Sequence, residues 1–221
     1  MTVTTIAEDL VLLLLDPESG RALVDRTSFD RAVGGALLLD LTVIGRITAD
    51  GDGARARLTV TDAGTTGDPL LDDALGRLSG RPIRAARAVE KLARKTRRPV
   101  LERLAERGVV VREDEKVLGL FPTTRWHTGD PRPRASLQAG IAAVLLGKAE
   151  PNERQAGLVS LLHAVKAEHK IVDGPKRELR ERARAISDGE WAGVAVRKAV
   201  QAVQATIMVA VAASSSTAAG G

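Results

Sequence analysis

Apolar side chains are grouped along this 221-residue chain in long blocks, and blocks of this length favour helices over strands. The first two run from Leu10 to Leu15 and from Gly35 to Ile44, on either side of a turn at 16–20. The last third of the chain is predicted to be helical as well. Its helices are expected at about 136–149, 153–167, 175–186 and 189–213.

The middle of the chain carries the clearest helix boundaries. Asp68 can cap a helix that begins at Pro69. A basic helix follows Pro82, and Pro99 is expected to kink or restart it because proline has no N–H to donate. The continuation of this helix is predicted to stop at Gly108.

Two short hairpins interrupt the helical pattern. The first is predicted at 46–49 and 57–60, where alternating side chains flank a turn rich in aspartate and glycine. The second is predicted at 109–112 and 116–121, around the charged turn 113–115.

These elements predict a mainly α fold: a single helical domain of amphipathic helices around a buried helical core, with two short β-hairpins. The domain is expected over residues 1–213, because no long low-complexity run interrupts it. Residues 214–221 are small and polar, and we expect them to form a flexible tail.

The composition limits where this protein can work. There is no cysteine, which excludes disulfides, thiolate metal sites and cysteine nucleophiles. The longest apolar stretch, 199–213, contains Gln201 and Gln204 and is shorter than the roughly 20 apolar residues that span a bilayer. We therefore expect a buried core helix there, and a cytoplasmic protein that contacts membranes only peripherally.

The positive charge is concentrated in one segment. Residues 81–107 carry ten Lys and Arg against three acidic residues, a net charge of +7. Residues 1–80 have a net charge of −6 and residues 108–221 of +4, within a total of +5. The middle segment alone therefore exceeds the charge of the whole chain.

Within this segment, basic residues three or four apart form one stripe on a predicted helix. Arg97 lies beside Arg94 at the edge of this stripe, and two neighbouring guanidinium groups suit a phosphate dianion. The alternative is an ordinary solvated helix face, but such a face usually mixes charges, and only Glu90 is placed to pair with Arg94. The stripe consists of Arg84, Arg87, Lys91, Arg94 and Arg98.

Nothing in the sequence points to catalysis. The last two of the three histidines, His127, His163 and His169, are six residues apart, which is not the spacing of a metal pair on a helix. We expect His163 and Trp191 to pack in the core, whereas Trp126 fits a core position or an exposed anchor equally well. With no glycine-rich phosphate loop either, the sequence predicts a protein that is not an enzyme and has no metal and no cofactor.

Five segments, in the same order, carry a resemblance to a known family. The most specific reads Thr66-Gly-Asp-Pro-Leu-Leu-Asp-Asp-Ala-Leu75. The other four run from Ile6 to Leu15, from Gly35 to Arg46, from Glu102 to Val110 and from Phe121 to Arg125. Together they resemble the Golgi phosphoprotein 3 (GPP34) family, and the bias toward Ala, Arg, Gly and Val looks like that of a bacterial relative.

This resemblance implies a single mainly helical domain that recognises phosphatidylinositol 4-phosphate. It also implies self-association through the hairpin 109–121 and a possible adaptor role. Two arginines of the family's lipid pocket match Arg94 and Arg97. The positions of its aromatic residue and third arginine fall on Asp25 and Gly34, with Arg26 and Arg31 as nearby alternatives for the arginine.

The leading hypothesis is therefore a peripheral membrane protein that binds an anionic lipid head group through Arg94 and Arg97, supported by the basic stripe. The alternative is a winged-helix-like nucleic-acid-binding protein, with helix 100–107 followed by a hairpin as the wing. That helix carries two arginines against two glutamates, so we regard nucleic acid as an improbable partner.

Overall fold

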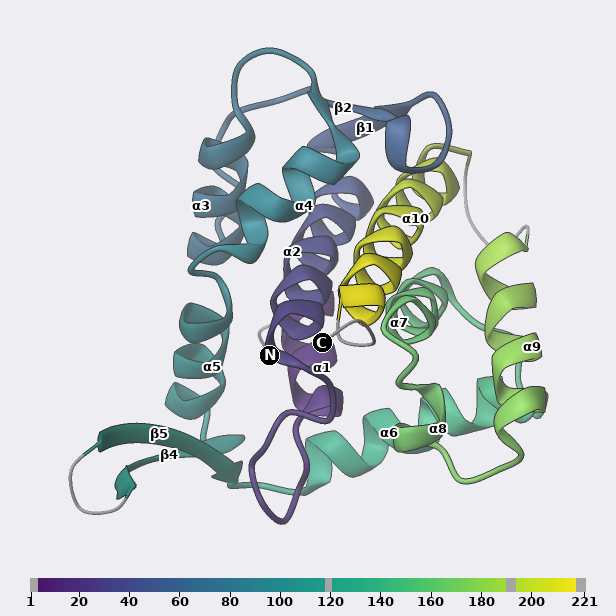
Figure 1. Ribbon diagram of the computed structural model, residues 1–221. Coiled ribbons are helices and arrows are strands. Elements are labelled where there is room, and N and C mark those ends of the chain that lie inside the picture. The colour runs from purple at the N-terminus through teal and green to yellow at the C-terminus, as the bar shows by residue number, and fades with distance from the viewer. Residues whose placement is uncertain (1–3, 118–120, 190–193, 218–221) are drawn as a thin grey trace.

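The computed structural model describes residues 4–117, 121–189 and 194–217 (Figure 1). Its strands are β1 (Ile47–Asp50), β2 (Arg57–Val60), β3 (Ile83–Arg84), β4 (Val110–Val117) and β5 (Phe121–Thr128), with the 3-10 turn η1 (Gly53–Arg55). Its helices are α1 (Ile6–Leu14), α2 (Arg26–Val43), α3 (Pro69–Leu78), α4 (Ala85–Ala93), α5 (Arg97–Glu106), α6 (Arg132–Leu145), α7 (Glu153–Ala164), α8 (Glu168–Ile171), α9 (Lys176–Asp188) and α10 (Val194–Thr217).

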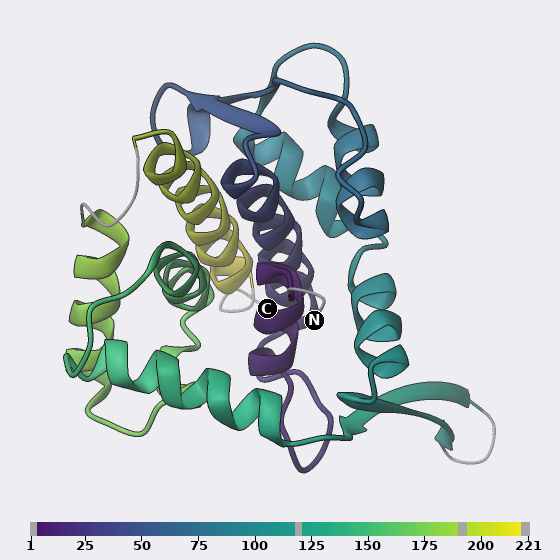
Figure 2. The same ribbon diagram turned by 180° about the vertical axis from the view of Figure 1, so that it is seen from behind.

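Helix α2 is the centre of the fold. It contacts α1, α3, α4, α7 and α10 (Figure 1), and its residues from Phe29 to Thr42 are mostly buried. Seen from behind, α1 lies over the lower part of α2 (Figure 2). Because one helical core runs through all these contacts, the prediction of a single mainly α domain is confirmed.

Helix α1 is fixed to its neighbours by buried polar groups. The Asp40 carboxylate accepts the backbone N–H groups of Ile6 and Ala7, at 2.7 and 3.1 Å, and burial raises the pKa of Asp40 to about 7. Glu8, which is fully buried, pairs with Arg103 at 3.2 Å and Arg107 at 2.7 Å. These ion pairs fix α5 against α1.

Helix α10 is long and apolar enough, by length and composition, to be a candidate membrane span over Val196–Ala213. One of its faces packs against α2, α4 and α7 and buries Ala199, Val203 and Ile207, as predicted for a core helix. The helix begins at Val194 and ends at Thr217, so its described end lies beyond the predicted end at residue 213. Residues 218–221 lie outside the described part of the chain.

The two β-hairpins differ from the prediction in two respects. The first hairpin forms as expected between β1 and β2, but β3 pairs with β2 and extends it to three strands. In the second hairpin, residues 113–115 belong to strand β4, so the predicted turn there is wrong. Both β4 and β5 are eight residues long, and Glu113 faces Arg125 across the ladder. Such a pairing stabilises a strand in which the sequence alone suggests a charged turn.

The basic helix is also divided differently from the prediction. It breaks at 94–96, before Pro99, where Lys95 adopts a left-handed backbone with φ 64°. Arg77 of α3 donates to the carbonyls of Lys91 and Arg94, which lack helical partners at the end of α4. Pro99 then lies in the first turn of α5, where a missing N–H costs nothing.

Candidate functional site

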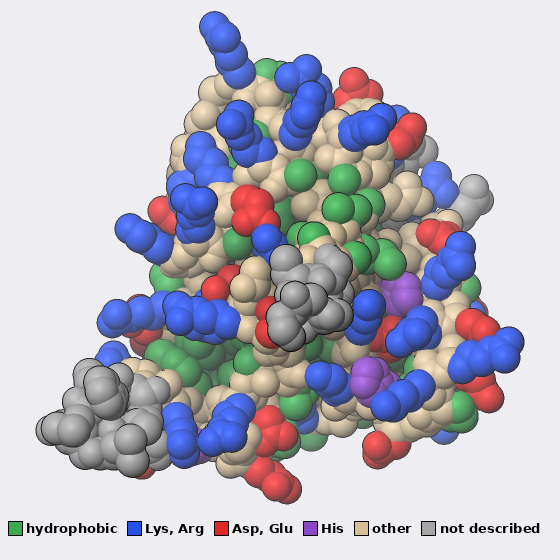
Figure 3. Space-filling model, in the orientation of Figure 1, with side chains coloured by type: hydrophobic (Ala, Val, Ile, Leu, Met, Phe, Trp, Pro, Cys, Tyr) green, Lys and Arg blue, Asp and Glu red, His purple; other side chains and the backbone are tan. Residues whose placement is uncertain are grey.

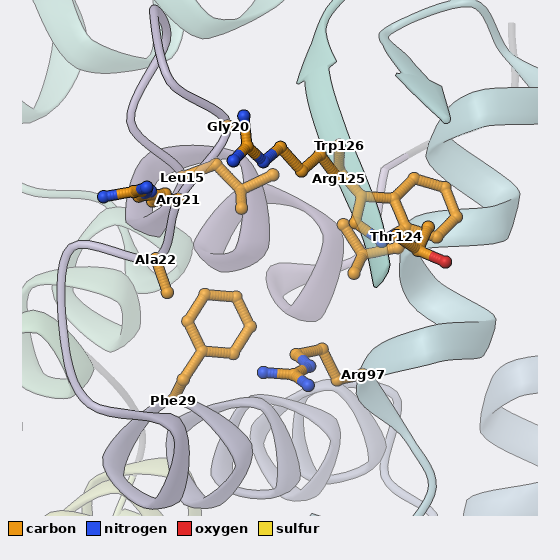
Figure 4. Close-up of a pocket in the computed structure, with 10 residues that line it drawn as sticks. Leu15, Gly20, Arg21, Ala22, Phe29, Arg97, Thr124, Arg125 and Trp126 are labelled. Carbon is orange, nitrogen blue, oxygen red and sulfur yellow. The ribbon is translucent and has the colours of Figure 1, made fainter. Parts of the chain in front are cut away.

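A cavity of about 380 Å³, the Arg97 pocket, lies where the α1–α2 loop, α2, α5 and the β4–β5 hairpin meet (Figure 4). Figure 4 shows Phe29 and Arg97 side by side, with Arg125 and Trp126 of β5 across from them. Its lining residues are Leu15, Gly20, Arg21, Ala22, Phe29, Arg97, Leu101, Thr124, Arg125 and Trp126.

The loop between α1 and α2 closes one side of this pocket. It is held at its base by a bridge between Leu15 and Ala22, and Thr128 of β5 donates to the carbonyl of Pro17 at 2.9 Å. Gly20 adopts φ 64°, and a Cβ added there would lie 2.4 Å from the carbonyl oxygen of Trp126. Glycine is thus the residue that lets the loop backbone reach the hairpin.

Arg97 is oriented by an aromatic ring and a carboxylate. Its guanidinium lies over the ring of Phe29, 5.6 Å from the ring centroid, a cation–π distance. Its Nε is 3.4 Å from Oδ1 of Asp30, and within the described chain no hydrogen bond satisfies that buried oxygen. Among the described residues no hydrogen bond involves the terminal nitrogens of Arg97, so these donors can serve a ligand.

Asp30 makes the charge of this pocket sensitive to pH. Burial raises the pKa of Asp30, an effect opposed by the positive charges of Arg97 and Arg26. While Asp30 is ionised, it neutralises part of the charge of Arg97. Arg21 and Arg125 add two further cations to the lining, and none of the described lining residues is acidic.

The structure separates the two arginines that the sequence pairs. Arg97 lines the pocket, whereas Arg94 lines a larger cavity of about 930 Å³ beside α4, which we call the α4 groove. Of the predicted stripe, Arg84, Arg87 and Lys91 also line this groove. Arg98 lies beyond the break and pairs with Glu102 at 2.7 Å, so the predicted single stripe is divided.

The positions that the family resemblance assigned to the pocket's aromatic residue and third arginine have other structural tasks. Asp25 caps α2 by accepting the N–H of Ser28 at 3.0 Å. Gly34 is buried against α4, and a Cβ there would lie 2.7 Å from the backbone nitrogen of Ala93, which leaves no room for arginine. Of the nearby alternatives, Arg26 pairs with Asp30 and Arg31 with Glu90.

The pocket instead draws its aromatic rings and additional arginines from residues that the sequence analysis did not assign to it. Phe29 and Trp126 are two of only four aromatic residues in the chain, and they meet in one cavity. The small number of aromatic residues was the signal in the sequence that pointed to Phe29 and Trp126, because few other positions can supply a ring. Arg21 and Arg125 gave no comparable signal, because a loop and a hairpin bring them together from segments about 100 residues apart.

Other predicted residues also have definite places. His163 is packed as expected, with its Nδ1 2.9 Å from a carboxylate oxygen of Glu168, while Trp191 lies outside the described residues. Arg103 of α5, the helix that would read DNA in the winged-helix alternative, points inward and pairs with Asp68 at 2.6 Å. No cluster of three potential metal ligands occurs among residues 4–117, 121–189 and 194–217.

No curated protein matches the chain. The family model described as Golgi phosphoprotein 3 (GPP34) matches residues 6–203, which include every residue that lines the Arg97 pocket and the α4 groove. The chain therefore belongs to the Golgi phosphoprotein 3 (GPP34) family.

Proposed function

We propose that this protein is a peripheral membrane protein of the cytoplasm that binds one anionic lipid head group in the Arg97 pocket. The observation that carries the proposal is the convergence of Arg21, Arg97 and Arg125 with two aromatic rings around a cavity of about 380 Å³. This volume suits a small polar head group. In this proposal the pocket binds and does not catalyse.

The chemistry of the lining supports a phosphorylated ligand. Arginine forks donate paired hydrogen bonds to phosphate oxygens. Half-buried Trp126 can place its ring at the level of the lipid head groups, where amphipathic aromatic side chains are favoured. Phosphatidylinositol 4-phosphate is the first lipid to test, because the family resemblance implies it.

Two observations weigh against the nucleic-acid alternative. The arginines of α5 that would face a DNA groove, Arg103 and Arg107, are only 18% and 24% exposed and pair with buried Glu8. The hairpin that would form the wing contributes Thr124, Arg125 and Trp126 to the pocket. Self-association through the hairpin and an adaptor role stay predictions.

Substituting each of the two predicted arginines separately tests the proposal. Arg97→Ala should weaken binding of soluble, short-chain phosphatidylinositol 4-phosphate by at least about tenfold, because a charge-assisted hydrogen bond and the stacked cation are lost. Arg94→Ala removes the same charge outside the pocket and should change this affinity by less than about twofold. Calorimetric titration measures both, and an Arg97→Ala variant that binds like the wild type would rule the pocket out.

A further inference from the structure

The α4 groove brings six basic side chains together. Within the described ranges, no ion pair joins any of its basic residues to an acidic side chain. Glu90, the one acidic residue among the described lining, is already bonded to Arg31 at 2.5 Å. The basic residues of the groove are Arg57, Arg81, Arg84, Arg87, Lys91 and Arg94.

This arrangement opposes folding when nothing is bound. Arg57 of β2 and Arg84 of β3 are directly opposite each other in the antiparallel ladder, and like charges in that position repel. Within α4, Arg87 and Lys91 are four residues apart, a spacing at which like charges also repel on a helix, and Arg94 follows at the C-cap. An anion in the groove would relieve both repulsions.

The groove is also held in shape by the core. Val89 and Leu92 on the opposite face of α4 are fully buried, so Arg87 and Lys91 are directed to solvent. Arg77 fixes the last carbonyls of the helix. At about 930 Å³, the cavity is more than twice as large as the Arg97 pocket and has room for more than one phosphate group.

The groove and the pocket lie on one face of the molecule. Figure 3 shows Lys and Arg side chains gathered over α4 and α5, with a hollow below them between α5 and the hairpin. A flat anionic partner can therefore meet both sites at once. The groove lining contains no aromatic ring on which unpaired bases could stack, which favours a lipid surface over a single-stranded nucleic acid.

We propose that the α4 groove is a second anion site, which binds the phosphates of anionic phospholipids next to the lipid held in the Arg97 pocket. The inference rests on the proposed function in one respect, that this face of the molecule meets a membrane. Once one site is occupied, the other binds within the same complex, so the two weak affinities reinforce each other.

The test uses vesicles that contain no phosphatidylinositol 4-phosphate. Wild-type protein should sediment with vesicles of phosphatidylcholine and phosphatidylglycerol but not with phosphatidylcholine alone. The groove variant Arg84→Gln/Arg87→Gln/Lys91→Gln should bind the vesicles that contain phosphatidylglycerol at least about tenfold more weakly than the wild type does. Its affinity for soluble phosphatidylinositol 4-phosphate should stay within about twofold of the wild-type value. The variant Arg97→Ala should bind these vesicles like the wild type but should bind soluble phosphatidylinositol 4-phosphate more weakly.

A matched control separates the groove from the total charge. The variant Lys176→Gln/Arg180→Gln/Arg184→Gln removes the same three charges from exposed positions of α9 and should change vesicle binding by less than about twofold. An equal loss in both triple variants would overturn the proposal. A groove variant that binds vesicles like the wild type would overturn it as well, while leaving the pocket untouched.

Two further measurements test the identity of the ligand and the repulsion between the cations. If the wild type bound random duplex DNA more tightly than phosphatidylglycerol vesicles at physiological salt, the occupant would be nucleic acid and the lipid proposal would fail. The groove variant should melt at or above the temperature of the wild type, because it removes like-charge repulsion. A lower melting temperature would contradict the argument from repulsion on which the proposal depends.

Discussion

The Arg97 pocket and the α4 groove are both cationic, but they are built in different ways. In the pocket, Arg97 is stacked on Phe29 and lies near Asp30, and the α1–α2 loop closes the cavity. In the groove, six cations are exposed, and among the described residues none of them has a carboxylate partner. The pocket therefore has fixed geometry and reduced charge, whereas the groove has much charge and little fixed geometry.

Because of this difference, we expect the pocket to select one head group and the groove to attract anionic surfaces in general. A pre-organised arginine in a pocket of fixed shape can distinguish one phosphorylated head group from another, because its donors point in set directions. Exposed cations respond to the number of anions nearby, and their contribution falls as salt is added. The following predictions use changes that should affect one region and leave the other intact.

The largest effect is expected from Gly20→Ala, which should close or displace one wall of the pocket. The new methyl group would meet the carbonyl oxygen of Trp126 at 2.4 Å on a backbone that already has φ 64°. We expect the free energy of unfolding to fall by about 1–3 kcal/mol. Calorimetry should detect no binding of the soluble head group, while binding to phosphatidylglycerol vesicles through the groove remains.

Gly45→Ala is the matched control for this change. Gly45 has a similar backbone, with φ 73°, but a Cβ there would meet no atom within 4 Å. Gly45→Ala should lower the free energy of unfolding by about 1 kcal/mol through backbone strain alone, and it should leave head-group affinity unchanged. If Gly20→Ala and Gly45→Ala had the same effect on binding, the contact between loop and hairpin would not shape the pocket.

The sequence predicted most elements of the fold because their signals are local. Asp68 and Pro69 mark the start of α3 whatever surrounds them, and Asp68 does accept the N–H of Leu70 at 2.9 Å. The break after Ala93 could not be predicted, because the group that stabilises it, Arg77, comes from another helix. The hairpin turn was misplaced for a similar reason, since cross-strand pairs stabilise the charged residues of β4.

The site was only partly predictable. Charge counting found the cations of α4 and α5, because charge density needs no tertiary information. It could not assign them to two cavities, since helical spacing places Arg94 and Arg97 on neighbouring positions only if the helix is continuous. The ring beneath Arg97 could not be predicted either, because Phe29 is 68 residues away along the chain and reaches Arg97 only because α2 and α5 both pack on α1.

A smaller effect is expected from Asp30→Asn, which removes the negative charge near Arg97. At neutral pH, where Asp30 is ionised, the variant should bind the head group a few times more tightly than the wild type, because no carboxylate competes with the ligand. Because burial raises the pKa of Asp30, this carboxyl becomes protonated at a higher pH than an ordinary aspartate does when the pH is lowered. The difference between the two proteins should therefore shrink in mild acid.

Comparing the variant with the wild type at each pH cancels the titration of the ligand phosphate itself. Asp188→Asn on α9, which removes an exposed charge far from the pocket, should show no difference from the wild type at any pH. Vesicle binding through the groove should not change either, because Asp30 does not line it. Weaker head-group binding by Asp30→Asn would show instead that the carboxylate holds Arg97 in position.

The smallest effect is expected from Arg84→Gln, which tests whether repulsion among the cations of the groove lowers stability. Arg84 faces Arg57 across the sheet and also lies at the N-terminus of α4, where the helix dipole disfavours a cation. Its removal should raise the free energy of unfolding by about 0.2–1 kcal/mol, as measured by urea denaturation. Arg98→Gln removes the same charge from a residue paired with Glu102, and should leave stability unchanged or slightly lower. Because Arg84→Gln should also weaken vesicle binding, stability and binding would change in opposite directions, as expected for a charge kept for a ligand and not for the fold.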